Sequence, residues 1–339
     1  MERVALSTDV ELASQRLRAG GLVAIPTETV YGLGALASSP QAVGRVFAAK
    51  GRPADHPLIV HIADAGEVDR WADPVPSGAR ALADAFWPGP LTLLLRRRSG
   101  VHDVVTGGLP TVGLRVPDHP LTLELLRLVR DGVAAPSANR FGKVSPTTAQ
   151  HVLADLGDVL DPTRDLILDG GPCVVGLEST IVDLSGPAPL LLRHGGIPGE
   201  AVSAVLGIPV AVDVGPARAP GMLVSHYAPS ARVVGVTAVD LTEHCATLAV
   251  RGATIAVLAD HRVAVGRHVI RLPSPDPYDA AGLAGVLYAR FRDADAAGAT
   301  HLVVQLPAGA GIGAAVIDRV IRAAASTVRV GSAFDSDRH

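Results

Sequence analysis

Two short polar stretches, each beside an apolar run, hold most of the side chains that could do chemistry. The first, residues 26–34, follows the apolar run 22–25 and contains hydroxyl groups, a carboxylate and a phenol. The second, residues 50–61, passes into the apolar run 58–62. Its cations and imidazoles are Lys50, Arg52, His56 and His61. Cations and neutral donors close to strand ends suit an anion with several oxygens, such as a phosphate.

Arg115 lies near the end of the apolar run 112–116, which is typical of a buried strand. A buried guanidinium without a counter-charge costs several kcal/mol. Arg115 therefore needs either an anionic ligand or a salt bridge, for which Glu28 and Glu178 are the candidates. We favour the ligand and leave both interpretations open.

Three further segments repeat this pattern. The stretch 133–147 passes from an apolar run into hydroxyls, an amide and cations, and its small residues allow a ligand to approach the backbone. The stretches 176–184 and 190–196 combine glycines with polar or cationic residues beside apolar runs. The candidate side chains that these segments add are Ser137, Asn139, Ser145, Ser179 and Arg193.

Alternating apolar runs and amphipathic stretches must position these residues. The stretch 40–50 predicts a helix that is capped by Ser39, begins with Pro40 and delivers Lys50 at its end. Strands that alternate with helices of this length favour an α/β sheet. We expect the strand ends of this sheet to converge on one concave face that binds a phosphorylated, polar molecule.

At 339 residues the chain is too long for one compact domain, and we expect two. The first spans residues 1–210. Residues 211–230 form a linker rich in proline and glycine, whose His226 and Tyr227 suggest that it docks on another surface. Residues 231–335 again alternate strands and helices, which predicts a smaller Rossmann-like α/β domain.

The composition argues against several classes of protein. The formal net charge of −3 does not favour a surface built throughout to bind nucleic acid. Cys173 and Cys245 lie far apart and outside any CxxC pattern, which argues against structural zinc and for a reducing compartment. No stretch reaches the length of a membrane span and no signal peptide is recognisable, so we expect a cytoplasmic protein without membrane contact.

One generic motif is present in the wrong context. Residues 32–37 fit the pattern G-x-G-x-x-A, yet a polar stretch separates them from the preceding strand and no helix begins directly after them. We therefore interpret them as a false dinucleotide fingerprint.

Six spaced motifs together resemble the YrdC-like threonylcarbamoyl-AMP synthases. They are PTETVYGLG, KGRPADHPLIVH, GLRVPDHP, APSANRFGKVSPTTA, GLESTIVD and LRHGGIP. This resemblance covers residues 1–208, and the linker with the domain after it resembles the longer, two-domain form of the family. It implies a fold in which an N-terminal twisted mixed sheet with helices and a concave site is linked to the smaller Rossmann-like α/β domain.

The activity that the resemblance implies is that of an L-threonylcarbamoyladenylate synthase, a nucleotidyltransferase. Such enzymes convert L-threonine, bicarbonate or carbon dioxide, and ATP into threonylcarbamoyl-AMP and pyrophosphate for the threonylcarbamoyladenosine modification of tRNA. Mg²⁺ would accompany the ATP, and no metal site made of protein side chains is expected. The product would pass to a tRNA threonylcarbamoyltransferase complex, and a direct contact with tRNA stays open.

The resemblance also assigns site residues. L-Threonine and bicarbonate would be held by Thr29, His61, Arg115, Ala135 and Ser179. ATP would be held by Lys50, Arg52, His56, Thr111, Ser137, Asn139, Ser145, Arg193 and Tyr227. Tyr227 would also close over the site as part of a lid. The family usually has asparagine where this chain has His56.

The implied chemistry needs no covalent nucleophile on the enzyme. The amine of threonine would take up carbon dioxide or bicarbonate to give a carbamate, and a carbamate oxygen would attack the α-phosphorus of ATP. Catalysis would then consist of positioning and of neutralising phosphate charge. We expect Lys50, Arg52 and Arg115 to carry it.

Two rival functions stay open. A concave basic site could grip double-stranded RNA or tRNA without catalysis, although few aromatic residues are available for stacking on bases. Domains that form carbamoyl-adenylate from carbamoyl phosphate resemble the same fold, but they come with zinc-finger and acylphosphatase-like segments that this sequence lacks.

Overall fold

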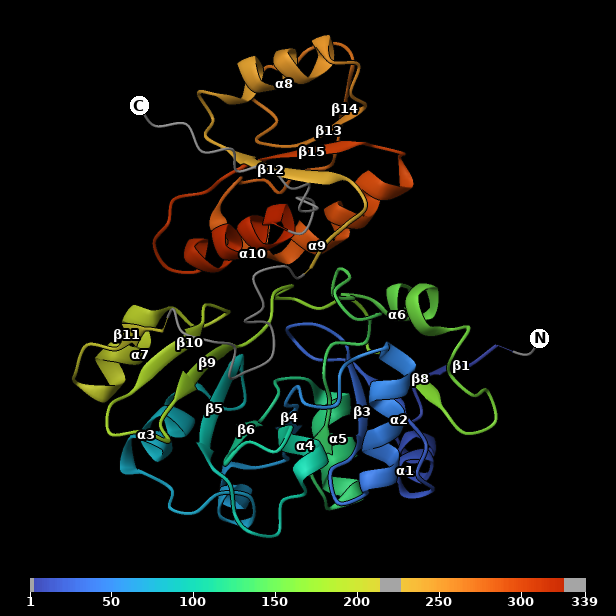
Figure 1. Ribbon diagram of the computed structural model, residues 1–339, viewed down its shortest axis with the longest axis vertical. Coiled ribbons are helices and arrows are strands. Elements are labelled where there is room, and N and C mark those ends of the chain that lie inside the picture. The colour runs from blue at the N-terminus through green and yellow to red at the C-terminus, as the bar shows by residue number, and fades with distance from the viewer. Residues whose placement is uncertain (1–2, 214–226, 326–339) are drawn as a thin grey trace, which may run out of the picture.

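Two β-sheets organise the molecule. The computed structural model describes residues 3–213 and 227–325. Within them, an 11-stranded mixed sheet precedes a four-stranded parallel sheet along the chain (Figure 1). Most of the expected linker, with His226, and the chain beyond residue 325 lie outside the described residues. None of the described helices is long and apolar enough to cross a bilayer.

The larger sheet has the strand order β1-β8-β2-β3-β7-β4-β6-β5-β9-β10-β11. Its strands are β1 (Ala5–Ser7), β2 (Val23–Ile25), β3 (Gly32–Leu36), β4 (Ile59–His61), β5 (Leu91–Arg96), β6 (Thr111–Arg115), β7 (Val133–Ala134), β8 (Leu166–Leu168), β9 (Thr180–Asp183), β10 (Leu190–Arg193) and β11 (Ala211–Val212). The helices among them are α1 (Val10–Arg18), α2 (Pro40–Lys50), η1 (Ala65–Arg70), α3 (Ser77–Phe86), α4 (Asp103–Thr106), α5 (Pro120–Val129), α6 (Ala149–Leu156) and α7 (Gly199–Leu206).

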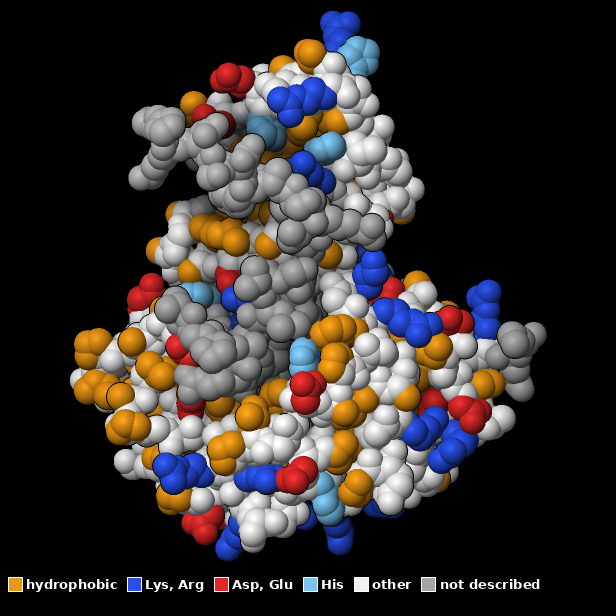
Figure 2. All heavy atoms as spheres, in the orientation of Figure 1, with side chains coloured by type: hydrophobic (Ala, Val, Ile, Leu, Met, Phe, Trp, Pro, Cys, Tyr) orange, Lys and Arg blue, Asp and Glu red, His pale blue; other side chains and the backbone are white. Residues whose placement is uncertain are grey.

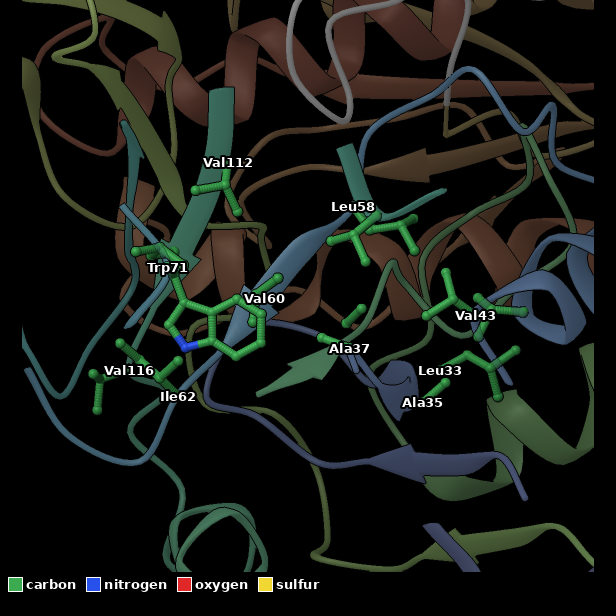
Figure 3. Close-up of a cluster of buried hydrophobic side chains, with 14 of the residues drawn as sticks. Leu33, Ala35, Ala37, Val43, Leu58, Val60, Ile62, Trp71, Val112 and Val116 are labelled. Carbon is green, nitrogen blue, oxygen red and sulfur yellow. The ribbon is translucent and has the colours of Figure 1, made fainter. Parts of the chain in front are cut away.

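Alternation of apolar residues along the strands builds one core on each face of this sheet. In β2, Ala24 points into the core that α2 and α3 cover, whereas Val23 and Ile25 point into the core that α1 and α5 cover. Figure 3 shows the first of these cores, in which Leu33 of β3 lies near Val43 of α2 and Val60 of β4 lies beside Trp71. Because both faces are covered, the central strands are largely apolar, as the sequence predicts, and the polar exceptions His61, Thr92 and Arg115 are buried with them.

Helix α2 begins and ends where its sequence predicts. The Ser39 hydroxyl accepts a hydrogen bond from Ala42 N at 3.3 Å, and Pro40 opens the first turn. Gly51 ends the helix in the left-handed conformation, with φ +62°. This sharp stop places Lys50 and Arg52 beside each other at the start of the next loop.

The pattern at residues 32–37 is a strand and the turn after it. Gly32–Leu36 forms β3, antiparallel to β2. A Cβ at Gly34 would lie 2.6 Å from Val133 Cγ1, so glycine is needed there for close strand packing. The interpretation as a false dinucleotide fingerprint is confirmed.

The smaller sheet is parallel and has the strand order β12-β15-β13-β14. Its strands are β12 (Arg232–Val236), β13 (Ile255–Leu258), β14 (Val269–Arg271) and β15 (His301–Gln305), and its helices are α8 (Leu241–Val250), α9 (Ala280–Ala296) and α10 (Gly313–Ala325). Helix α8 covers one face, and α9 and α10 cover the face toward the larger sheet (Figure 1). The core under α9 and α10 also contains Val30, Val144 and Leu177 of the first domain, so the two domains share buried apolar contacts.

Candidate active site

One pocket forms where several strands of the larger sheet end. Nine of the residues predicted from the sequence line it together. They are Thr29, Arg52, His61, Arg115, Ala135, Ser137, Ser179, Arg193 and Tyr227. They come from segments that are up to about two hundred residues apart in the chain, and only the sheet brings them together.

His61 and Arg115 lie side by side because β4 and β6 are parallel and pair these two residues directly. Both side chains are buried. Arg115 Nη2 lies 2.7 Å from Glu28 Oε1, and Arg115 Nε donates to Gly89 O at 3.3 Å. Of the two interpretations of Arg115, the salt bridge is therefore present, with Glu28 as partner, and the guanidinium still lines the pocket.

The neighbouring imidazole of His61 is uncharged at neutral pH. Burial, reinforced by the charge of Arg115, lowers the pKa of His61 to about 3. Its Nδ1 lies 3.4 Å from the carbonyl oxygen of Val133. The site thus has a fixed cation and a neutral hydrogen-bonding ring at adjacent positions.

Ser179 is held from two sides. Its hydroxyl lies 2.7 Å from Thr92 Oγ1. The guanidinium of Arg193 donates to the carbonyl oxygen of Ser179 from Nε at 3.0 Å and from Nη2 at 2.8 Å, and Nη2 also reaches the hydroxyl at 3.0 Å. A Cβ at Gly195 would lie 2.3 Å from the carbonyl carbon of Ser179, so only glycine permits this approach.

Thr29 belongs to a tight turn between β2 and β3. Thr27 Oγ1 accepts hydrogen bonds from Thr29 N and Val30 N, both at 3.2 Å, and lies 2.8 Å from Thr29 Oγ1. Both threonines are buried and line the pocket. The hydroxyl groups are therefore fixed before any ligand arrives.

The end of α2 supplies two more cations. Lys50 Nζ donates to the carbonyl oxygens of Ser137 and Asn139, both at 2.5 Å. Burial and the neighbouring charge of Arg52 hold the pKa of Lys50 well below its usual value. Burial likewise lowers the pKa of Arg52 to about 10. An anionic ligand would raise both pKa values again, which makes this end of the pocket suited to phosphate.

Five predicted residues lie outside the pocket lining. Asn139 donates from Nδ2 to the carbonyl oxygens of Arg140 and Lys143 and so holds its loop. Ser145 donates to Glu178 Oε1 at 2.7 Å, and His56 packs edge-on against Phe141. Thr111 lies at the start of β6, at the opposite end of that strand from Arg115. The fifth is Lys50, and the ligand contacts of all five stay predictions.

The sequence analysis missed several residues of the pocket. Thr27, Val30, Gly32, Ile59 and Pro136 also line it, and each is within three residues of one that was predicted. Glu178, which we considered only as a salt-bridge partner for Arg115, lines the pocket and is instead paired with Arg319 of the second domain. An arginine in the apolar stripe of α10 was the available signal for Arg319.

Tyr227 belongs to the expected linker, is the first residue described after the gap at 214–226, and closes one side of the pocket. It is 1% exposed and stacks on Tyr288, with ring centres 5.6 Å apart and an angle of 28° between the planes. Basic and acidic side chains are both scattered over the face that Figure 2 shows. In the pocket, the guanidiniums of Arg52, Arg115 and Arg193 outnumber the carboxylate of Glu178.

Comparison with known proteins gives a consistent picture. Residues 15–195 match the Sua5–YciO–YrdC family model, described as telomere recombination, and residues 197–325 match a model described as threonylcarbamoyl-AMP synthase, C-terminal domain. A threonylcarbamoyl-AMP synthase of Pyrococcus abyssi is 49% identical over 233 residues, which are 67% of each chain. One of Bacillus subtilis is 48% identical over 226 residues, which are 65% of this chain and 64% of that relative.

A solved structure extends the likeness to both domains. The crystal structure of Pyrococcus abyssi Sua5 complexed with L-threonine has a TM-score of 0.86 and 38% identity, and the match covers 95% of this chain and 98% of that one. The mixed sheet with a second, parallel-sheet domain is therefore the fold of this family. The chain belongs to the YrdC-like family of threonylcarbamoyl-AMP synthases, in its two-domain form.

Proposed function

We propose that this chain condenses L-threonine, bicarbonate or carbon dioxide, and ATP into threonylcarbamoyl-AMP, with release of pyrophosphate. The observation that carries the proposal is one pocket that gathers the guanidiniums of Arg52, Arg115 and Arg193 with the hydroxyls of Thr29 and Ser179. Relatives named for this product, and one whose crystal structure holds L-threonine, support an enzyme rather than a non-enzymatic RNA-binding module.

Threonine binds at the end of the pocket that contains Arg115. Glu28 and the carbonyl oxygen of Gly89 fix this guanidinium, so it can receive the amino-acid carboxylate without reorganising. Neutral His61 adds no second positive charge beside the amine of threonine. Thr29 and Ser179 offer hydroxyl groups to the remaining polar atoms.

ATP binds at the end of the pocket that contains Arg52 and Arg193, with Lys50 behind them. These cations neutralise the charge that develops on the phosphates as pyrophosphate leaves. Mg²⁺ enters with the ATP in this proposal, as the resemblance to the family implies. When bound, the ion would supply further neutralisation of the phosphates.

The reaction has two bond-forming steps. The neutral amine nitrogen of threonine bonds to the carbon of carbon dioxide and releases one proton to solvent. With bicarbonate a C–O bond breaks instead, and the same proton leaves within the water molecule that forms. A carbamate oxygen then bonds to the α-phosphorus, and the bond to the pyrophosphate oxygen breaks. We assign this chemistry to a catalytic domain of residues 1–210, followed by a linker over 211–230 and a C-terminal domain over 231–335.

The product is a mixed anhydride that water destroys, so a lid and a nearby acceptor have a physical purpose. We propose that a tRNA threonylcarbamoyltransferase complex takes it up, and that Tyr227 is part of the lid. The buried free thiols of Cys173 and Cys245 fit the reducing environment of the cytoplasm.

Mass detection of the adenylate, with each substrate omitted in turn, tests the proposal. We expect product and pyrophosphate only when threonine, bicarbonate and ATP are all present. Carbamoyl phosphate in place of threonine and bicarbonate is the control for the related carbamoyl-adenylate chemistry. Pyrophosphate release that needs carbamoyl phosphate, or steeply salt-dependent RNA binding without any ATP consumption, would contradict the proposal.

A further inference from the structure

Glu178 is a buried carboxylate of the pocket whose two oxygens are held by both domains. Its Oε1 accepts a hydrogen bond from Ser145 Oγ at 2.7 Å. Its Oε2 accepts from Tyr288 OH at 2.7 Å and from Arg319 Nε at 2.8 Å, and these two residues belong to α9 and α10. A carboxylate of the first domain is therefore satisfied mainly by the second.

Arg319 reaches a second residue of the same pocket. Its side chain is 0% exposed, and Nη2 donates to the carbonyl oxygen of His194 at 2.9 Å. Its guanidinium carbon lies 5.1 Å from the ring centre of Tyr227, which itself stacks on Tyr288. One side chain of α10 thus contacts Glu178 and Tyr227, which both line the pocket.

The charge of Glu178 matters because it lies beside the cations assigned to ATP. Burial alone would raise the pKa of Glu178, but the guanidiniums of Arg319 and Arg193 bring it down to about 2, so the carboxylate is ionised at neutral pH. If Arg319 were absent, Arg193 would be the remaining guanidinium that balances this charge. Arg193 would then be drawn to a carboxylate instead of to phosphate.

We propose that Arg319 of the second domain is a positioning residue for the ATP end of the site. By neutralising Glu178 and supporting Tyr227, it keeps Glu178 from competing with the phosphates of ATP for Arg193. The inference rests on the proposed function for the identity of the nucleotide. It gives the second domain a direct part in the site, which is complete only while α10 is docked.

Arg292 provides a matched control at the same domain boundary. It lies on α9, and its guanidinium donates to both carboxylate oxygens of Asp155, at 2.9 and 2.7 Å. It also donates to the carbonyl oxygen of Val144. These partners lie outside the pocket lining. Removal of Arg292 therefore loosens domain docking without changing the charge next to Arg193.

The experiment compares Arg319→Met, Arg319→Lys, Arg292→Met and the double variant Glu178→Gln/Arg319→Met in the full-length chain. The dissociation constant of ATP is measured by binding titration, and the KM values for ATP and threonine are measured separately. We expect Arg319→Met to raise both ATP constants about tenfold and the KM for threonine by no more than about threefold. We expect Arg292→Met to change each constant by less than about twofold.

The double variant tests the charge argument. Because Glu178→Gln removes the carboxylate that competes for Arg193, we expect it to restore ATP binding to within about threefold of wild type in the Arg319→Met background. Arg319→Lys keeps a positive charge but loses the planar fork, so we expect an intermediate loss. If Arg319→Met fails to fold, Arg319→Lys and the double variant decide the matter by the same ATP titration.

Three outcomes would overturn the inference: equal losses in Arg292→Met and Arg319→Met, unchanged ATP binding in the Arg319 variants, or no recovery in the double variant. The first would show that domain docking alone matters. Failure of the proposed function looks different, because a wild-type protein that binds ATP and makes no adenylate would leave the binding comparison intact.

Discussion

Both sheets of this molecule carry polar side chains at their strand ends, but these side chains have different surroundings in the two sheets. In the larger sheet, the side chains at the ends of β4, β6 and β10 converge on one pocket. In the smaller sheet, the carboxyl ends of the parallel strands are where such folds commonly bind ligands. There, Tyr278 OH donates to Leu258 O at 3.2 Å and to Gln305 O at 2.8 Å, and Asp260 pairs with Arg262.

The contrast shows that topology alone does not make a site. The polar groups named at the smaller sheet's edge satisfy one another. The larger sheet instead holds buried cations that face a pocket. The second domain contacts that pocket with its helices α9 and α10 and not with its strand ends. Tyr288 and Arg319 on these helices form hydrogen bonds to Glu178.

Substitution of Arg115 would show how strongly function is confined to the larger sheet. We expect Arg115→Met to lower adenylate formation at least about a hundredfold, because the carboxylate of threonine loses its fixed partner. The unpaired Glu28 should also destabilise the fold, by about 3–5 kcal/mol. Product formation and thermal unfolding are the two measurements.

The double variant Glu28→Gln/Arg115→Met separates these two effects. It removes both buried charges, so stability should recover while adenylate formation stays low. Near-normal turnover in either variant would mean that the amino acid binds elsewhere.

Gly195 tests whether the pocket depends on close approach of the main chain. A Cβ at this position would lie 2.3 Å from Thr180 N and 2.3 Å from the carbonyl carbon of Ser179. We therefore expect Gly195→Ala to destabilise the protein by about 1–3 kcal/mol and to raise the KM for threonine. Gly44, exposed in α2 with open space around it, is the matched control. Gly44→Ala should instead stabilise by up to about 1 kcal/mol. Equal effects at the two glycines would contradict this account of Ser179.

Acid titration should distinguish the buried imidazole of the pocket from a half-buried one in the second domain. The folded protein holds the pKa of His61 at about 3, against 6.5 for a free histidine. Between these values the unfolded chain binds a proton that the folded chain does not, so stability is complete above about pH 6.5 and falls with decreasing pH.

His61→Gln should therefore make the stability curve flatter between pH 6.5 and about 3. His301→Gln is the control, because His301 lies half-buried on β15. Chemical denaturation at several pH values measures the difference. If the His61→Gln and wild-type curves were parallel, the imidazole would take up its proton at the same pH in the folded and the unfolded chain, which would contradict a lowered pKa.

The smallest effect is expected at the edge of the second sheet. Tyr278→Phe removes a hydroxyl that donates to two main-chain carbonyls, which should cost about 1 kcal/mol of stability. Because this hydroxyl belongs to the internal network of that edge, adenylate formation should stay within about twofold of wild type. A tenfold loss of adenylate formation would mean that the strand ends of the smaller sheet also contribute to the reaction.

The rule that polar residues at strand ends meet a ligand found part of the pocket, and the family resemblance added Ala135 and Tyr227. The rule selected Arg115 and Arg193 because each lies at the end of an apolar run, and Ser179 because it precedes one. The sequence also predicted α2 and the alternation of strands and helices after residue 231, and the structure confirms both.

What the sequence did not reveal depends on how the two domains dock. Tyr288 and Arg319 lie more than a hundred residues from Glu178, and no local pattern encodes the surface on which α9 and α10 rest. The partner of Arg115 was open for a different reason, because Glu28 and Glu178 both lie beside apolar segments of the first domain. Only the register of β4 and β6 and the turn after β2 decide between them.

The scarcity of lysine has a practical consequence for studying this protein. Lysine occurs twice, and Lys50 is 3% exposed with its amine bonded to main-chain carbonyls. Lys143 is exposed, in the loop that pairs with Ala228 at the boundary between the domains. Among the side chains, an amine-directed dye would therefore react mainly at Lys143, where its fluorescence would report on the packing of that boundary.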